Sequence, residues 1–319
     1  MPSVRSPLPL HVAQLSPEGR RLLLLVWRAA ALLGVAMGLG TLVLHLGSDP
    51  FVDVRRFYEA GARLNAGLPL YGWIAGGSAT DSLAYLNPPL LAILFRPLAL
   101  LPFPAAVLVW EAGLLAACGY ALRRAGLRGP LRGAVLIAVG CLMPAFAWAI
   151  AVGQSEPVVL ALLSWGSPLG VALAGQLKLV PLLAAAFWLV RRDVRSLVRC
   201  ALWSAGLALV QVALAPTDTL AYLQLGWLQG AMDWNTISLY RIHPLLWVAL
   251  VVVLAVAVVR SAGGRWGWAS AVALAVLAHP RLLLYQLLTL VAVFGGPAGT
   301  PAGADGSRTA STAPRIDAA

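Results

Sequence analysis

Long apolar segments, separated by short stretches that carry most of the arginines, are the dominant feature of this sequence. A transmembrane helix needs about 20 predominantly apolar residues, and several of these segments reach that length. Hydrophobic residues make up 60% of the chain and charged residues 11%, which leaves too little polar surface for a soluble protein of this size. We therefore predict an all-α, multi-pass membrane protein with a bundle of roughly nine to eleven transmembrane helices.

The arginines predict how these helices are oriented. Clusters of arginine mark the cytoplasmic face by the positive-inside rule. They occur at Arg20 and Arg21, at Arg123, Arg124, Arg128 and Arg132, at Arg191, Arg192, Arg195 and Arg199, and at Arg260 and Arg265. The loops at residues 48–87, 152–156 and 217–242 are then expected outside. Topology explains the net charge of +11, and no nucleic-acid partner is expected.

The ends of the chain differ from its middle. Residues 22–47 form an apolar segment longer than the core of a cleaved signal peptide, so we expect it to remain as the first span. We predict a cytoplasmic N-terminal segment over residues 1–21 and a membrane domain over residues 22–296. Residues 297–319 are mainly Gly, Ala, Pro, Ser and Thr without apolar periodicity, which predicts a disordered tail.

Prolines interrupt two of the long apolar stretches, residues 88–122 and 155–190. Proline breaks or kinks a helix, and broken helices are tolerated at membrane depth only where they are buried in protein or line a polar cavity. We therefore expect a cavity that opens to the outside. The remaining spans are expected at about residues 105–122, 132–151, 196–215, 243–259, 266–279 and 281–296.

The first external loop, residues 48–87, holds four of the twelve acidic residues. Within it, apolar or aromatic residues recur at helical spacing around Asp53, which predicts an interfacial amphipathic helix. These residues are Val54, Phe57, Tyr58, Gly61 and Leu64. Asp53 lies near the start of this helix, so it is either a helix cap or a reactive carboxylate. Asp49 is a weaker candidate, because Ser-Asp-Pro is a common turn.

Polar residues elsewhere are few and therefore informative. Lys178 is the single lysine of the chain and lies within an apolar stretch, where it is either a functional buried charge or a lysine reaching the membrane surface. Gln154 and Glu156 follow the span at residues 132–151 and either contact a sugar or form a polar turn.

Two later segments add further polar groups. Asn235 and Arg241 lie in an expected external loop, where an arginine can bind phosphate. His279, Arg281 and Tyr285 cluster at the start of the last span. The nucleotide-binding, metalloprotease and CxxC motifs are missing from the sequence, so we expect neither a cofactor nor a metal ion.

Six segments together resemble a known family. In order they read DVRRFYEAGARLNAGLPLY, YLNPPLLAILFRPLALLP, GQSEPVVLALL, GQLKLVPLLAAAFWLVRR, NTISLYR and HPRLLLYQLL. The chain resembles the polyprenyl-phosphate-mannose-dependent mannosyltransferases, which have the C-type membrane glycosyltransferase fold. These include actinobacterial α-1,2-mannosyltransferases and related arabinosyltransferases. The similarity covers about residues 20–296.

This resemblance implies a hexosyltransferase of the cell membrane with its active site on the extracytoplasmic face. Its donor is a polyprenyl-phosphate-linked sugar, most simply mannose, and its acceptor a hydroxyl of a glycolipid or glycan, with membrane lipids around it. Asp53 matches the family's catalytic Asp and is expected to act as general base in an inverting displacement. The expected substrate-binding residues are Arg55, Arg56, Tyr58, Tyr85, Gln154, Lys178, Asn235, Arg241, His279 and Tyr285.

Two other classes of function remain open at this point. A transporter or lipid flippase would also use broken helices and a charged residue near mid-membrane, but it predicts paired inverted halves, and no such symmetry is visible in the sequence. A non-catalytic membrane scaffold would not require the polar residues to converge in one place.

Overall fold

The computed structural model describes residues 16–71, 85–126, 132–224, 235–264 and 266–297 of the 319-residue chain. In these ranges the chain forms α-helices and 3-10 helices and no β-strand. The all-α prediction is confirmed. Most of the expected N-terminal segment and nearly all of the expected tail lie outside the described residues, so the domain boundaries stay predictions.

Among the described residues, four helices are long and apolar enough to cross a membrane alone. They are α2 (Pro17–Ser48), α5 (Phe103–Arg124), α11 (Val194–Leu214) and α14 (Pro244–Ser261). A fifth crossing forms if α6 (Arg132–Cys141) and α7 (Met143–Val152), which are bent by 61° relative to each other, act as one span. At most 28% of the apolar stretch of any of the four single helices is buried within the protein. Apolar surface exposed on this scale is stable in lipid, and the protein is a multi-pass membrane protein.

The other apolar segments form helices too short to cross a membrane alone. They are α8 (Glu156–Trp165), α9 (Pro168–Leu177), η3 (Val180–Ala185) continuing into α10 (Ala186–Val190), α15 (Gly267–Leu277) and η4 (Leu284–Phe294). Helices α8 and α9 have ten residues each, or about 15 Å, half of a hydrocarbon core of about 30 Å. Several of the nine to eleven expected spans are therefore short helices, and the last is a 3-10 helix.

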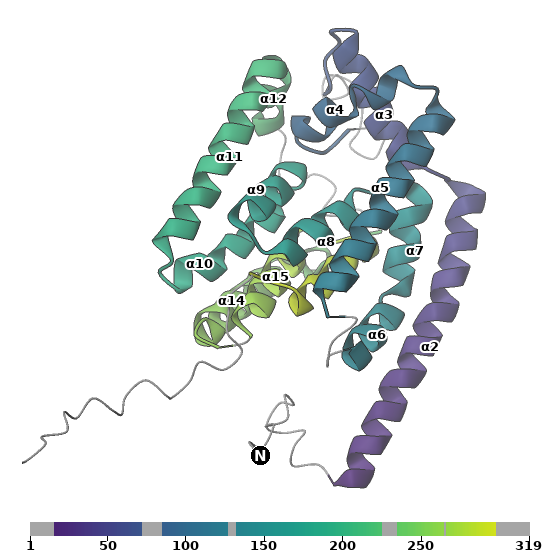
Figure 1. Ribbon diagram of the computed structural model, residues 1–319, viewed down its shortest axis with the longest axis vertical. Helices are drawn as coiled ribbons and strands as arrows, with labels where there is room; N and C mark the ends of the chain where they lie inside the picture. Colours follow the sequence, from purple (N-terminus) through teal and green to yellow (C-terminus); the bar gives the residue numbers. More distant parts are fainter. Residues whose placement is uncertain (1–15, 72–84, 127–131, 225–234, 265, 298–319) are drawn as a thin grey trace, which may run out of the picture.

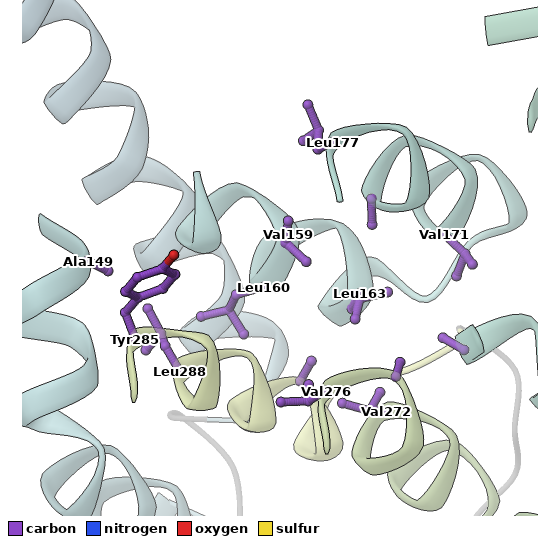
Figure 2. Close-up of a cluster of buried hydrophobic side chains, with 14 of the residues drawn as sticks. Ala149, Val159, Leu160, Leu163, Val171, Leu177, Val272, Val276, Tyr285 and Leu288 are labelled. Carbon is purple, nitrogen blue, oxygen red and sulfur yellow. The ribbon is translucent and has the colours of Figure 1, made fainter. Parts of the chain in front are cut away.

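Proline explains why the stretch at residues 155–190 is broken as predicted. A proline occupies the first or second position of α8, α9 and η3, where its missing N–H costs no hydrogen bond but prevents a continuous helix. The short helices lie in the middle of the bundle (Figure 1). There α8 packs against η4, with Leu160 buried near Leu288 (Figure 2).

Helix α3 (Val52–Asn65) confirms the amphipathic helix predicted in the first loop. Val54, Phe57 and Gly61 are buried, whereas Tyr58 and Leu64 are half-buried. Gly61 allows close packing on α4 (Pro89–Phe95), because a Cβ at this position would lie 2.7 Å from the backbone of Phe95.

The remaining short helices are η2 (Leu98–Leu100), α12 (Pro216–Gln224) and α13 (Leu239–Ile242). Helices α3, α4 and α12 share the end of the molecule at which α2 finishes (Figure 1). This is the end that the arginine pattern places outside.

Candidate functional site

Asp53 lies in the first turn of α3 but does not cap it. The helix begins at Val52, and its N-cap residue, Phe51, makes no side-chain cap hydrogen bond. Phe51 adopts φ 54°, in the left-handed region that is uncommon for residues other than glycine. Its backbone N–H donates to Ala151 O at 2.9 Å, which ties the start of α3 to the end of α7. The capping interpretation of Asp53 is therefore wrong.

The Asp53 carboxylate is buried and held from two sides. Arg56 Nη1 donates to Asp53 Oδ1 at 2.5 Å, and Gln154 Nε2 donates to Asp53 Oδ2 at 2.9 Å. Burial raises the pKa of the Asp53 carboxyl above its usual value. Nearby positive charges oppose this rise in pKa, and they belong to Arg56, Lys178 and Arg281.

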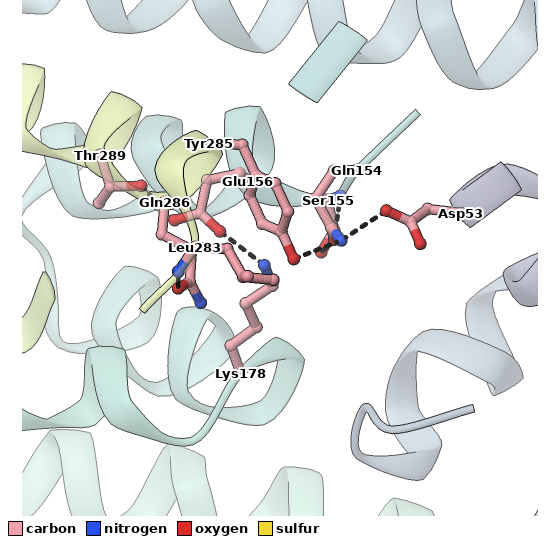
Figure 3. Close-up of polar contacts among 9 residues, drawn as sticks. All are labelled: Asp53, Gln154, Ser155, Glu156, Lys178, Leu283, Tyr285, Gln286 and Thr289. Atoms are coloured by element: carbon pink, nitrogen blue, oxygen red, sulfur yellow. Dashed lines mark hydrogen bonds and ion pairs between the residues drawn. The ribbon is translucent and has the colours of Figure 1, made fainter. Parts of the chain in front are cut away.

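Gln154 connects Asp53 to the last helix of the bundle. Its Oε1 accepts hydrogen bonds from Ser155 N at 2.9 Å and Ser155 Oγ at 3.2 Å. This orients the amide so that Nε2 donates both to Asp53 and to Tyr285 Oη, the latter at 3.1 Å (Figure 3). The oxygen and nitrogen of this amide are therefore assigned by the network itself.

Gly153 makes this arrangement possible. It ends α7 with φ 72°, a left-handed conformation that favours glycine. A Cβ at Gly153 would lie 1.9 Å from Val54 Cγ2, so a larger residue would displace the start of α3. Trp110 Nε1 donates to Gly153 O at 2.8 Å. A glycine is thus required at position 153 because α3 passes directly over the turn.

Lys178 forms a second buried ion pair behind Tyr285. Its Nζ donates to Glu156 Oε2 at 2.6 Å, and Thr289 Oγ1 donates to Glu156 Oε1, also at 2.6 Å. Lys178 Nζ also lies 4.9 Å from the centre of the Tyr285 ring. Lys178 is 8% exposed and has an extended backbone at the end of α9, where the broken helix continues into η3. The interpretation that this lysine reaches for the membrane surface is wrong.

A small cavity adjoins this ion pair. Its lining comes from α8, η3, α15, η4 and the segments before η3 and η4: Glu156, Lys178, Pro181, Ala275, Val276, His279, Gln286 and Thr289. Arg281 N donates to His279 Nδ1 at 3.2 Å, which folds the His279 ring back over its own loop. The predicted residues Gln154, Lys178, His279 and Tyr285 therefore lie in one connected region with Asp53 and Arg56.

Three of the expected substrate-binding residues point elsewhere. Arg55 is exposed on the other side of α3 and stacks over the Phe103 ring at 4.5 Å. Tyr58 Oη donates to Leu101 O at 2.8 Å. Tyr85 Oη donates to Pro88 O and accepts from Ala92 N, so it supports the start of α4. Successive residues of a helix point in different directions, so Arg55 and Tyr58, although close to Asp53 in the sequence, contact other parts of the protein.

Asn235 and Arg241 occupy an intermediate place. Both are exposed, but their segment is joined to the His279 loop by a hydrogen bond from Ile237 N to Leu282 O at 2.8 Å. Thr236 Oγ1 also donates to Leu282 O, at 3.4 Å. The two residues thus lie on the segment beside the site rather than within the buried cluster.

Glu156, which the sequence suggested only as a sugar contact or part of a polar turn, and three further polar residues of this region were not among the expected substrate-binding residues. Glu156 is the buried partner of Lys178, while Gln286 and Thr289 are polar positions in the last apolar segment. Glu111 is an acid within the spanning helix α5, and neither of its buried carboxylate oxygens has a hydrogen-bond partner in the described part of the chain. Polar residues inside apolar helices are rare and usually functional, and this rule would have identified all four.

The described residues contain no group of three or more His, Cys, Asp or Glu side chains placed to hold a metal ion. The groups that line this site are a buried carboxylate, a phenol, an amide and buried cations. Such a set suits proton abstraction by Asp53 next to a place for an anion.

Comparison with known proteins identifies the family. A curated relative from Mycolicibacterium smegmatis (strain ATCC 700084 / mc(2)155), a polyprenol-phosphate-mannose-dependent alpha-(1-2)-phosphatidylinositol pentamannoside mannosyltransferase, is 32% identical over 156 residues. This match covers 44% of the chain and 38% of the relative. No solved structure matches. Residues 85–295, about two thirds of the sequence, match glycosyltransferase family 87, and the chain therefore belongs to this family.

Proposed function

We propose that this protein is a membrane glycosyltransferase that moves a sugar, mannose first among the candidates, from a polyprenyl-phosphate donor to a hydroxyl of a lipid- or glycan-linked acceptor. Membership of glycosyltransferase family 87 supports the transfer of a sugar. The name of the relative supports a polyprenol-phosphate-mannose donor. The observation that carries the proposal is the buried Asp53 carboxylate, joined through Gln154 and Tyr285 to the region of Lys178.

The proposed reaction is a single displacement with inversion. Asp53 removes the proton from the acceptor hydroxyl while that oxygen attacks the anomeric carbon of the donor sugar. The bond between the anomeric carbon and the phosphate oxygen breaks, and its electron pair leaves with the polyprenyl phosphate. A phosphate is already a good leaving group, so one carboxylate is sufficient and no glycosyl-enzyme forms. Gln154 and Arg56 hold Asp53 in position.

The cation needed for the departing phosphate comes from the other side of Tyr285. Lys178 is the buried candidate, and His279 lies beside it in the lining of the cavity. In this arrangement the sugar occupies the region of Tyr285, with the base on one face and the phosphate on the other, as inversion requires. Asn235 and Arg241, on the exposed neighbouring segment, are our candidates for contacting the acceptor.

The expected location is the cell membrane, with the site on the extracytoplasmic face. The arginine clusters support this location. They lie at the ends of α5 and α14, near the start of α11 and, as Arg20 and Arg21, at the start of α2. Asp53 instead follows the C-terminal end of α2. A donor phosphate that keeps its lipid tail would remain at the membrane surface close to α3.

The test compares two isosteric substitutions on the same helix. Asp53→Asn removes the base, and we expect transfer from a polyprenyl-phosphate sugar in membranes to fall by at least about 100-fold. Glu59→Gln, a half-buried acid on α3 outside the cluster, is the matched control and should transfer at the wild-type rate. Wild-type transfer by folded Asp53→Asn protein would refute the assignment of the base.

A further inference from the structure

The cavity beside Lys178 is equipped to bind an anion. His279 Nδ1 accepts a hydrogen bond from Arg281 N, so in the neutral ring the proton resides on Nε2, which is a donor. Gln286 Oε1 accepts from Leu283 N at 2.7 Å, so its Nε2 carries two further N–H donors. Both residues line the cavity together with Lys178. Three nitrogen donor groups thus belong to the lining of one small space.

The carboxylate of Glu156 lies among these hydrogen-bond donors. Glu156 Oε2 accepts from Lys178 Nζ at 2.6 Å, and Glu156 lines the same cavity. Its other oxygen is held by Thr289. With Glu156 in this position, the charge of Lys178 is neutralised within the protein and the cavity is small. A phosphate can approach Lys178 only when the Glu156 carboxylate moves away from it.

We propose that this cavity receives the phosphate of the donor lipid, and that Glu156 is a resident counter-ion that the phosphate displaces from Lys178. The inference rests on the proposed function and deepens it. His279 and Gln286 supply neutral donors, and Lys178 supplies the charge. Phosphate oxygens accept all three kinds of hydrogen bond. The exchange forms and breaks only hydrogen bonds and an ion pair.

The exchange also explains how the product leaves. Transfer turns a phosphodiester with one negative charge into a phosphate monoester with a second ionisable oxygen, which a fixed lysine would hold more tightly. Glu156, still anchored near Lys178 through Thr289, competes for the same ammonium group and lowers the affinity for the spent lipid. Glu156 is therefore a positioning and release residue, distinct from the base Asp53.

The experiment measures binding of polyprenyl monophosphate to the full chain in detergent micelles, with the matching polyprenol, which lacks phosphate, as the control ligand. Glu156→Gln keeps the shape of the side chain and removes the competing charge, so we expect the affinity for polyprenyl monophosphate to rise about tenfold. Its affinity for polyprenol should not change. In the transfer assay, product inhibition should strengthen by a similar factor.

Two further variants make the test independent of whether Glu156→Gln folds. Gln286→Glu keeps the oxygen that accepts from Leu283 N but replaces the donor amide by a negative carboxylate, and should weaken phosphate binding about tenfold. Thr219→Val, on α12 outside the lining of the cavity, removes only a hydrogen bond to Ala215 O and, as the control, should alter affinity by less than about threefold.

Unchanged or weaker phosphate affinity in folded Glu156→Gln protein would overturn this inference, as would wild-type affinity in Gln286→Glu. The proposed function would survive that result if Asp53→Asn still abolished transfer. Conversely, wild-type protein that binds polyprenyl monophosphate as predicted but transfers no sugar would refute the proposed function and support the anion site.

Discussion

Gln154 Nε2 donates a hydrogen bond to Asp53 Oδ2 at 2.9 Å, although the two residues are 101 positions apart in the chain. The same nitrogen donates to Tyr285 Oη. One amide therefore joins α3, the turn between α7 and α8, and the last helix of the bundle, η4. Changes at Gln154 are expected to act on the reactivity of Asp53 rather than on the fold alone.

Replacing Gln154 by Glu tests this connection. A second carboxylate next to Asp53 would raise the pKa of Asp53 further, because two like charges in one site disfavour ionisation of either. We expect kcat/KM to fall by about 100-fold at neutral pH and to recover partly at higher pH. The pH dependence of kcat/KM is the measurement. A variant with reduced activity but an unshifted pH profile would show that Gln154 has only a structural role.

Arg56 also influences the pKa of the Asp53 carboxyl. Burial raises the pKa of Asp53, and Arg56 is the strongest opposing influence. A base must be ionised, so activity is lost as the pH falls through this raised pKa. Arg56→Gln should raise the pKa further and move that loss of activity to higher pH, whereas Arg56→Lys should leave it near the wild-type position. Identical profiles for the two variants would contradict the pairing.

Substitutions in the ion pair between Lys178 and Glu156 allow effects on stability to be distinguished from effects on activity. Lys178→Met leaves Glu156 buried without its cation, which should destabilise the protein by roughly 3–5 kcal/mol. The double variant Lys178→Met, Glu156→Leu removes both charges and should regain most of this stability, but not transfer. Thermal unfolding in detergent and sugar transfer are the two measurements. Recovery of transfer in the double variant would exclude Lys178 from phosphate binding.

Gly153 should tolerate no side chain. Gly153→Ala places a Cβ 1.9 Å from Val54 Cγ2 at a position with φ 72°, and we expect a loss of roughly 1–3 kcal/mol of stability together with lower transfer. Gly113→Ala on α5, where a Cβ meets nothing within 4 Å, is the control and should be neutral or slightly stabilising. Equal effects of the two substitutions would mean that α3 is not seated on the Gly153 turn.

Glu111 has a buried carboxylate, which either destabilises the fold or takes part in the reaction. Its carboxylate oxygens are buried without a hydrogen-bond partner among the described residues, and one lies 2.9 Å from where a Cβ of Gly153 would be. If Glu111 only destabilises the folded protein, Glu111→Leu should increase the free energy of unfolding by roughly 1–3 kcal/mol and leave transfer unchanged. Thermal unfolding and transfer assays decide this. Loss of transfer with unchanged stability would assign Glu111 a part in the reaction.

The all-α membrane fold follows from the sequence because its signals are local. Apolar length and the exclusion of unpaired backbone groups from lipid leave helices as the solution for α2, α5, α11 and α14. Helical spacing likewise predicted α3, and prolines predicted the break between α8, α9 and η3. Whether the shorter helices fully cross the bilayer depends on packing partners, which a hydropathy pattern does not contain.

The sequence by itself determined which residues were candidates for the site: a single lysine within an apolar stretch, an acid at the start of a helix predicted to be external, and a Gly-Gln pair. Only the tertiary structure decided which of them meet. It joined Asp53 to Gln154 and Tyr285, paired Lys178 with Glu156, and directed Arg55, Tyr58 and Tyr85 to other contacts. The reason is physical: hydropathy and helical period act between near neighbours, whereas a buried charge is stable only beside a partner that packing brings from elsewhere in the chain.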